Sequence, residues 1–531
     1  MIDIAKKDDR RGILSGVAAM GIATIIVKML SVLYKIPMLN ALGEEGMGYF
    51  NTAYTIYGFF YIVCTAGVPK AITILISDAS ERGEYRERDG ILRSAFTLFF
   101  AIGLLLFLVF LTMSGIIARC IGSPKSVLSM IVIAPTLIIV SVTGVLRGYL
   151  SAVGRLGAIS VSQILEGVFK LCLGLLLSRY SLQIGLDTPT CAAVAVVGVD
   201  LGALVAMLYM FIVYKKENKD YNIGQKISFG NFKRNSKSIF SISVPITLTS
   251  AVMSVSSIID LLMIMSRLGS IGYSEDTCAG LFGNYTTLAV PMLNLCVSLI
   301  APLSIAYLPR LTSYFSRGCE SKYRSAFSSF YNITMLCAAF LFSVLHFFPR
   351  QVLYFIFGEN GYLLGAELLS VLSVSVITYS ALIVVNTALE SRRCVRAPLI
   401  SMLIGCIFKI PIEYFLLSRP EINIFGAAHS TNITYLIALL ISVFLGVRSG
   451  VFKPVDAFLC IGYLASSVLS AEGALYVYRM LNWSAENRVQ TLGILPFMLL
   501  LYIILSIFIT TFGYLFIKSR RIAQKTVQNF I

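Results

Sequence analysis

Four charged side chains lie inside apolar segments and form two matching pairs. Lys28 and Lys35 are seven residues apart in the first apolar segment, and Asp260 and Arg267 repeat this spacing 232 residues later. Seven helical residues return to within about 20° of the same direction, so each pair forms one stripe. Charges inside a membrane helix are costly and indicate function. The three cations therefore predict an anion-binding cleft.

The same four residues allow a structural alternative. Lys28 and Asp260 could form a salt bridge that only holds two lobes together, which leaves Lys35 and Arg267 as excess cations that need an anion. In the functional interpretation, Asp260 pairs with Lys28 while no anion is bound in the cleft, or it helps to couple function to a cation.

Two further pairs have helical i, i+4 spacing. Glu166 and Lys170 form one pair, and Lys409 and Glu413 form the other. Such pairs neutralise each other along a helix, so an intrahelical ion pair near the bundle interior is the favoured interpretation. We keep all four as secondary cavity candidates.

Other polar residues give weaker signals. Arg147 and Arg155 bracket a helix connection, where we expect a solvated, cytoplasmic role. Asp200 has no partner that the sequence identifies. The sequence has no CxxC and no phosphate-binding loop. We therefore expect no metal, no cofactor and no enzymatic activity, with a coupling Na⁺ or H⁺ as the one small ion to consider.

The elements that position these residues follow from composition. The chain has 531 residues, of which 57% are hydrophobic and only 13% charged. Soluble domains carry about 25% charged residues, so a soluble enzyme is excluded. We predict an all-α polytopic membrane protein of about fourteen transmembrane helices. The expected spans are 12–38, 46–77, 93–117, 127–150, 157–179, 189–214, 238–266, 279–308, 325–348, 363–389, 397–418, 424–446, 455–478 and 491–517.

The placement of the positive charges indicates orientation. The connections on one side carry 30 of the 43 Lys and Arg residues, and those on the other side carry 8. Positive residues concentrate in cytoplasmic loops, so both termini and the 215–237 loop are expected inside. The net charge of +16 is thus explained without nucleic acid.

An internal repeat indicates two lobes. Arg93-Ser94-Ala95-Phe96 parallels Arg324-Ser325-Ala326-Phe327, and Phe169-Lys170 parallels Phe408-Lys409. The offset of 231–240 residues corresponds to six spans, which predicts parallel repeats. The expected parts are an N-lobe (1–214), a basic linker (215–237), a C-lobe (238–446) and a C-terminal pair of helices with a basic tail (447–531).

Two prolines mark expected gates. Pro69 and Pro309 interrupt the second and eighth spans near the cytoplasm. Proline removes a backbone hydrogen bond and kinks a helix, so these points could open and shut an inner gate. A static kink satisfied by packing is the alternative.

The chain resembles the stage V sporulation protein B-like polysaccharide-biosynthesis transporters. These belong to the multidrug/oligosaccharidyl-lipid/polysaccharide (MOP) exporter superfamily, which includes the lipid II flippases. The residues that carry the resemblance are Lys28 to Gly43 with Tyr34-Lys35-Ile36-Pro37, Ala66-Gly67-Val68-Pro69, Leu146-Arg147-Gly148-Tyr149, Ser162-Gln163, Glu166, Ile259-Asp260, Arg267-Leu268, Gly272, Leu281-Phe282-Gly283, Pro291, Leu293-Asn294-Leu295 and Pro309.

The resemblance implies two six-helix lobes around a central cavity, as in multidrug (MATE) transporters. It implies flipping of an undecaprenyl-pyrophosphate-linked glycan, such as lipid II, across a bacterial cell membrane. Lys28, Lys35 and Arg267 would then bind the pyrophosphate, and Asn294 becomes a further cavity candidate. The expected partners are this lipid-linked oligosaccharide and membrane lipids, and we expect a monomer.

Two other functions stay open. A cation-coupled multidrug or small-metabolite antiporter is the first, although its cavity would favour acidic residues over Lys28, Lys35 and Arg267. A membrane glycan polymerase or ligase is the second, although the outer connections are short.

Overall fold

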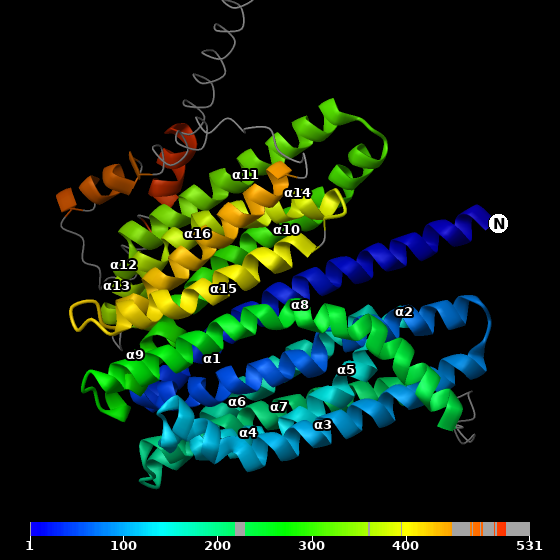
Figure 1. Ribbon diagram of the computed structural model, residues 1–531, viewed down its shortest axis with the longest axis horizontal. Helices are drawn as coiled ribbons and strands as arrows, with labels where there is room; N and C mark the ends of the chain where they lie inside the picture. The colour runs from blue at the N-terminus through cyan, green and yellow to red at the C-terminus, as the bar shows by residue number, and fades with distance from the viewer. Residues whose placement is uncertain are drawn as a thin grey trace, which may run out of the picture. The chain divides into compact units, whose positions relative to one another are not determined.

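The protein is described from a computed structural model (Figure 1). The structure describes residues 2–217, 229–358, 362–394 and 396–448, together with short helical pieces between 468 and 505. Side chains are described from residue 30 onward within these ranges, apart from residues 31, 32, 229, 249 and 253. The described chain is almost entirely helical, which confirms the all-α class.

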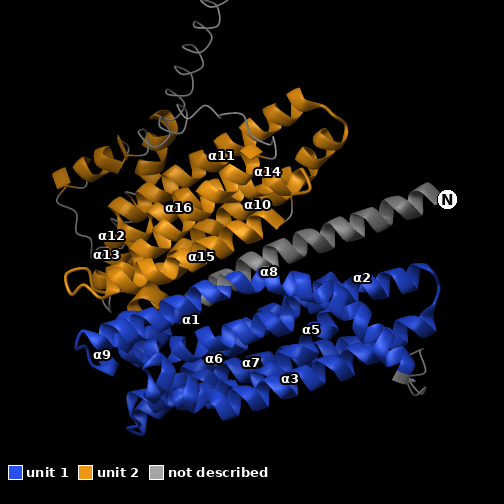
Figure 2. Ribbon diagram, in the orientation of Figure 1, with its two compact units in different colours: residues 1–283 blue, residues 284–531 orange. Residues whose placement is uncertain are grey.

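The chain divides into two compact units, Met1–Gly283 and Asn284–Ile531, each treated by itself (Figure 2). The elements of unit 1 are α1 (Ile2–Thr65), α2 (Val68–Glu81), α3 (Tyr85–Ile121), the short 3₁₀ turn η1 (Pro124–Ser126), α4 (Val127–Ile133), α5 (Thr136–Ala152), α6 (Leu156–Gln183), α7 (Thr188–Glu217), α8 (Phe229–Ser270) and α9 (Glu275–Asn284).

Unit 2 begins at the end of α9 with a π-helical segment. Its elements are η2 (Tyr285–Ala289), α10 (Val290–Ser316), α11 (Glu320–Phe347), α12 (Pro349–Phe357), α13 (Tyr362–Leu372), α14 (Val374–Ser391), α15 (Arg396–Leu417) and α16 (Phe425–Arg448). A further apolar helix covers Pro496–Leu505.

Within the described residues, eleven helical stretches are long and apolar enough to cross a membrane. They run in chain order from Leu33–Glu81 to Phe425–Arg448 and coincide with the second to twelfth expected spans. The first expected span lies mostly on residues whose side chains are not described, and the last two lie largely outside the described residues. The protein is therefore a multi-pass membrane protein, and the count of fourteen stays a prediction.

The first long helix is broken at Gly43. This residue has φ 69° and ψ −176°, a conformation that only glycine adopts easily, and it separates two helical halves of α1. The break falls between the first and second expected spans. The two halves are therefore separate helices that meet at a kink without a loop.

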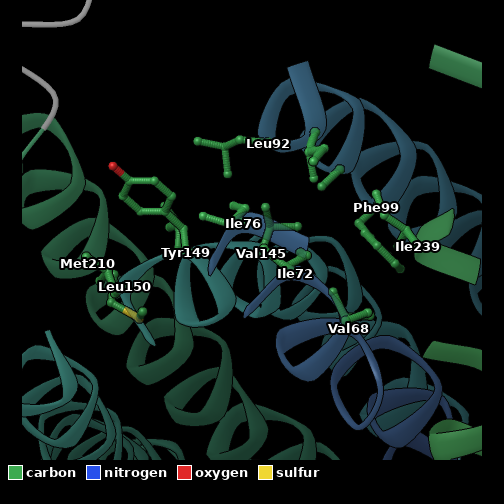
Figure 3. Close-up of a cluster of buried hydrophobic side chains, with 14 of the residues drawn as sticks. Val68, Ile72, Ile76, Leu92, Phe99, Val145, Tyr149, Leu150, Met210 and Ile239 are labelled. Atoms are coloured by element: carbon green, nitrogen blue, oxygen red, sulfur yellow. The ribbon is translucent and has the colours of Figure 1, made fainter. Parts of the chain in front are cut away.

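The core of unit 1 gathers side chains from six helices, α2, α3, α5, α6, α7 and α8, and Figure 3 labels ten of these side chains. Val68, Ile72 and Ile76 lie four residues apart on α2 and form one buried face. They pack with Leu92 and Phe99 of α3, and the cluster continues with Val145, Tyr149, Leu150, Met210 and Ile239. Burying an aliphatic side chain contributes about 1.5–3 kcal/mol in water, and in lipid the same close packing fixes the helices against one another.

Unit 2 has its own cores. One joins Leu311 of α10, Phe330 of α11 and Leu389 of α14. Another places Phe348 beside Ala474 and Met498, and the Tyr502 hydroxyl donates a hydrogen bond of 2.7 Å to the Leu336 carbonyl. The described parts of the two last spans thus pack on α11 and its end.

The two units repeat local structures. α6 packs along α7 in unit 1, and α15 packs along α16 in unit 2. The turn after α2 at Gly83 (φ 73°) recurs after α10 at Gly318 (φ 66°), 235 residues later. These correspondences agree with the internal repeat read from the sequence. The unit boundary lies at Gly283, and α8 packs on α1, α2 and α3; the lobe boundaries stay a prediction.

Candidate functional site

An aromatic row lines one face of the second half of α1. Phe50, Tyr54, Tyr57 and Tyr61 follow one another with helical spacing, and their successive ring centroids are 5.8, 5.7 and 5.7 Å apart. The row faces into unit 1, where α1 packs against α5, α6 and α7. It supplies a continuous wall of ring faces and hydroxyls.

One lysine contacts this wall, and a second lysine lies near the first. The Lys170 ammonium of α6 lies 4.9 Å from the Tyr34 ring centroid and 4.3 Å from the Tyr54 ring centroid, and it donates a hydrogen bond of 3.2 Å to the Tyr54 hydroxyl. Lys35 of α1 is half-buried and lies close enough for the two charges to repel. A cation against aromatic rings with a second cation nearby forms a positive site that an anion between them would stabilise.

A buried ion pair lies farther along the row. Arg147 of α5 contacts Glu166 of α6 at 2.9 Å, and only 14% of the Arg147 side chain is exposed. Its guanidinium is also hydrogen-bonded to Tyr61. The expectation that Arg147 is solvated was therefore wrong, whereas its place on the cytoplasmic side stays a prediction. Arg155, in contrast, is exposed and pairs with Glu217 at 2.8 Å.

The pairing also changes the interpretation of α6. The sequence favoured an ion pair between Glu166 and Lys170, but the structure directs Glu166 to Arg147 and Lys170 to Tyr54. The expected intrahelical pair is thus wrong, because partners on α5 and α1 come closer than the neighbouring turn. Asp200 of α7 accepts a hydrogen bond from the Thr136 hydroxyl, a partner that the sequence did not identify.

Glycines on α7 hold α6 in this position. A Cβ on Gly202 would lie 2.7 Å from the Glu166 carbonyl oxygen and 3.0 Å from the Lys170 amide nitrogen. A Cβ on Gly198 would lie 2.4 Å from the Gly174 backbone. Small residues four apart let two membrane helices approach closely. The α6–α7 contact therefore sets where Glu166 and Lys170 point.

The charge stripes predicted from the sequence are placed in part. The Lys28 side chain lies outside the described residues, although its backbone belongs to α1. Lys35 joins Lys170 as described above. On α8, Asp260 is 9% exposed and Arg267 is half-buried, and α8 packs along α1. The anion-binding role of Lys28, Lys35 and Arg267 stays a prediction.

The predicted residues of unit 2 have different environments. Lys409 and Glu413 of α15 are fully buried, whereas Asn294 of α10 is exposed. In the described part of the chain, no group of three or more His, Cys, Asp or Glu side chains is arranged to hold a metal ion.

The two proline positions differ. Pro69 lies in the first turn of α2, directly after the break between Thr65 and Val68, and its carbonyl accepts a hydrogen bond from Thr73. Pro309 is exposed and lies inside α10, which continues through it to Ser316. The second span is therefore interrupted as expected, whereas α10 is not interrupted at Pro309. Gating at either position stays a prediction.

Known proteins are similar to this chain in sequence and in fold. Residues 13–315 match the family described as polysaccharide biosynthesis protein. The chain is 23% identical over 519 residues to stage V sporulation protein B of Bacillus subtilis (strain 168), which covers 90% of this chain and 98% of that relative. It is 22% identical over 460 residues to the lipid II flippase MurJ of the same strain, with 81% of each chain covered.

Solved structures agree. The lipid II flippase MurJ in an inward closed conformation has a TM-score of 0.70 at 16% identity, covering 92% of this chain and 97% of that one. An inward-facing MATE transporter of the MOP superfamily has a TM-score of 0.67 at 14% identity, covering 82% and 98%. These likenesses establish the fold. Because the family match spans more than half of its residues, the chain belongs to the polysaccharide biosynthesis protein family.

Proposed function

We propose that the protein is a flippase of the bacterial cell membrane, working without enzymatic chemistry. It moves an undecaprenyl-pyrophosphate-linked glycan from the inner to the outer leaflet by alternating access of two lobes. Support comes from the family, from the similarity to stage V sporulation protein B and from the similarity to a lipid II flippase. Lipid II is the substrate to test first.

One observation carries the proposal: the Lys170 ammonium lies beside the Tyr34 and Tyr54 rings, and Lys35 is near enough for the two charges to repel. A pyrophosphate must leave water to cross a membrane. One cation 4 Å from an anion contributes about 4 kcal/mol at an effective dielectric constant of about 20, before desolvation is counted. Two or three cations could therefore offset much of the transfer cost of the headgroup, whereas the cavity of a cationic drug would need the opposite charge.

Depletion in the native host tests the function. We expect a lipid-linked glycan precursor to accumulate on the cytoplasmic face. Expression of the Lys170→Gln variant in the depleted cells should not remove this accumulation. Lys170→Arg should clear part of it, because the charge stays while its geometry changes. A normal precursor distribution after depletion would contradict the proposal, and glycan polymerisation by the purified protein would favour a polymerase.

A double mutant tests the predicted stripe. If Lys28 is a ligand, Lys28→Ala should abolish transport without preventing membrane insertion, and Lys28→Ala/Asp260→Asn should stay inactive. If Lys28 and Asp260 form only a structural salt bridge, each single variant should be unstable and the double variant should regain activity. An active, substrate-specific double variant would remove Lys28 from the site.

A cation-coupled antiporter is the second candidate. The fold of a MATE transporter favours it, as do the carboxylates of Glu166 and Asp200 inside unit 1. Export of a drug driven by a Na⁺ or H⁺ gradient, lost in Asp200→Asn and present without any lipid-linked glycan, would support this function over the flippase. Because coupling to such a gradient is compatible with a flippase as well, the identity of the transported molecule decides between the two functions.

A further inference from the structure

Unit 2 contains a basic pocket that the proposed function does not use. It has a volume of about 520 Å³ and lies where α14 ends, α15 begins and α16 ends. Arg393, Arg396 and Arg448 line it together with the apolar side chains of Ile400 and Leu445. We call this the arginine pocket. The charge count assigns this end of the helices to the cytoplasmic side.

The three arginines of the pocket differ in their pairing from the arginine beside them. Among the described residues, no acidic side chain forms an ion pair with Arg393, Arg396 or Arg448. The adjacent Arg392 shows the contrast, since it pairs with Glu320 at 3.0 Å and lies 4.5 Å from the Tyr323 ring centroid. Arg392 is held by contacts within unit 2, whereas Arg393, Arg396 and Arg448 line the pocket.

The backbone at Arg393 gives a second, independent indication. Arg393 has φ 67°, and the equivalent turn of unit 1, 239 residues earlier, has Gly154 at φ 76°. The hydrogen bonds match: the Cys394 amide donates to the Leu389 carbonyl at 2.9 Å, as the Arg155 amide does to Leu150 at 2.8 Å. A side chain in this left-handed conformation costs free energy that glycine avoids. The presence of arginine where glycine would be less strained therefore indicates that the charge of Arg393 has a function.

The chemistry of the pocket selects a phosphate. Guanidinium groups bind phosphate oxygens through paired hydrogen bonds, and the first turn of α15, which starts at Arg396, adds the partial positive charge of a helix N-terminus. An apolar stripe leads away from the pocket along α15 through Ile400, Leu403 and Ile407, all exposed. A free phosphate would make no contact with this apolar stripe, whereas the acyl chain of a lipid would cover it.

We propose that the arginine pocket binds the phosphate headgroup of an anionic membrane phospholipid, whose acyl chain lies along Ile400, Leu403 and Ile407. Basic pockets between helix ends on the cytoplasmic side suit such lipids. The proposal is independent of the transported substrate. Its occupant would bind at the edge of unit 2 and stay in one leaflet.

Native mass spectrometry of the full chain in detergent, titrated with phosphatidylglycerol or phosphatidylcholine, tests the proposal. We expect a tightly held phosphatidylglycerol adduct and no equivalent phosphatidylcholine adduct. Arg393→Gly, Arg396→Gln and Arg448→Gln should each weaken it about tenfold, the effect of losing one charge-assisted hydrogen bond. Arg317→Gln, which removes an exposed arginine beside the Gly318 turn, is the matched control and should leave the adduct unchanged.

Arg393→Gly also guards against misfolding. Glycine suits the left-handed turn, so this variant should keep or raise the thermal stability of the lipid-free protein while it loses lipid. An unchanged phosphatidylglycerol adduct in the triple variant Arg393→Gly/Arg396→Gln/Arg448→Gln would overturn the proposal. So would equal retention of phosphatidylcholine, or displacement of the adduct by millimolar inorganic phosphate, which would identify a site for free phosphate instead.

Discussion

At the scale of single residues, the Arg147–Glu166 pair is the most informative contact in unit 1. It joins α5 to α6 at 2.9 Å and lies beside the aromatic row. Two charges taken out of water are tolerated only when each neutralises the other, so neither residue can be replaced alone without cost.

We expect Arg147→Gln or Glu166→Gln alone to destabilise the protein by a few kcal/mol, because each leaves one charge largely buried and uncompensated. The double variant should regain most of this loss. Thermal unfolding of the purified protein in detergent measures both effects.

The Arg155–Glu217 pair is the control for this prediction. Its Arg155 side chain is 59% exposed, so Arg155→Gln should change stability by less than about 1 kcal/mol. A double Arg147→Gln/Glu166→Gln variant as unstable as the sum of its single variants would show that the two residues act independently.

At the scale of elements, the close contact between α6 and α7 positions the site. We expect Gly202→Ala to push α6 away and to cost about 1–3 kcal/mol, because the new methyl group meets the Glu166 and Lys170 backbone. Transport should fall with it, since Lys170 leaves the Tyr34 and Tyr54 rings. A transport assay and thermal unfolding together measure the change.

Gly157→Ala is the matched control on α6. A Cβ there meets no atom within 4 Å, so the substitution should be neutral or slightly stabilising. Equal losses from Gly202→Ala and Gly157→Ala would mean that helix propensity, and not the distance between α6 and α7, decides the outcome.

The prolines give a second prediction for elements. If the break before α2 and the prolines of α10 allow an inner gate to move, Pro69→Ala/Pro309→Ala should lower transport while expression continues. Pro69→Ala should account for most of the loss of transport, because Pro69 lies at a helix break whereas Pro309 lies inside a continuous helix. Unchanged transport in the double variant would identify static kinks.

The sequence predicts elements better than contacts here. Apolar segments of about 20 residues locate the described spans because membrane thickness imposes that length. The Arg147–Glu166 pair could not be predicted, since it depends on how α5 packs on α6. Charge counting placed Arg147 with the solvated cations because it uses only position along the chain. The spacing of Tyr54, Tyr57 and Tyr61 was a readable signal for the aromatic row, and the sequence interpretation missed it.

At the scale of the whole molecule, orientation follows from charge. Reporter fusions should place both termini and the 215–237 loop in the cytoplasm, because 30 of the 43 cations lie on that side. Accessibility of each reporter to a membrane-impermeant reagent measures this. A C-terminus outside the cell would require an odd number of spans and would contradict both fourteen helices and a parallel repeat.

Gly43 has a stereochemical consequence for the whole chain. A Cβ at this position would meet no atom within 4 Å, so space is not what excludes a side chain. The dihedral angles of Gly43, 69° and −176°, are the mirror image of an ordinary extended L-residue. A D-alanine introduced there by chemical ligation would fit without strain, whereas L-alanine would not. The two helical halves of α1 are therefore joined at a point where the chain needs the opposite hand, and glycine is the one encoded residue that provides it.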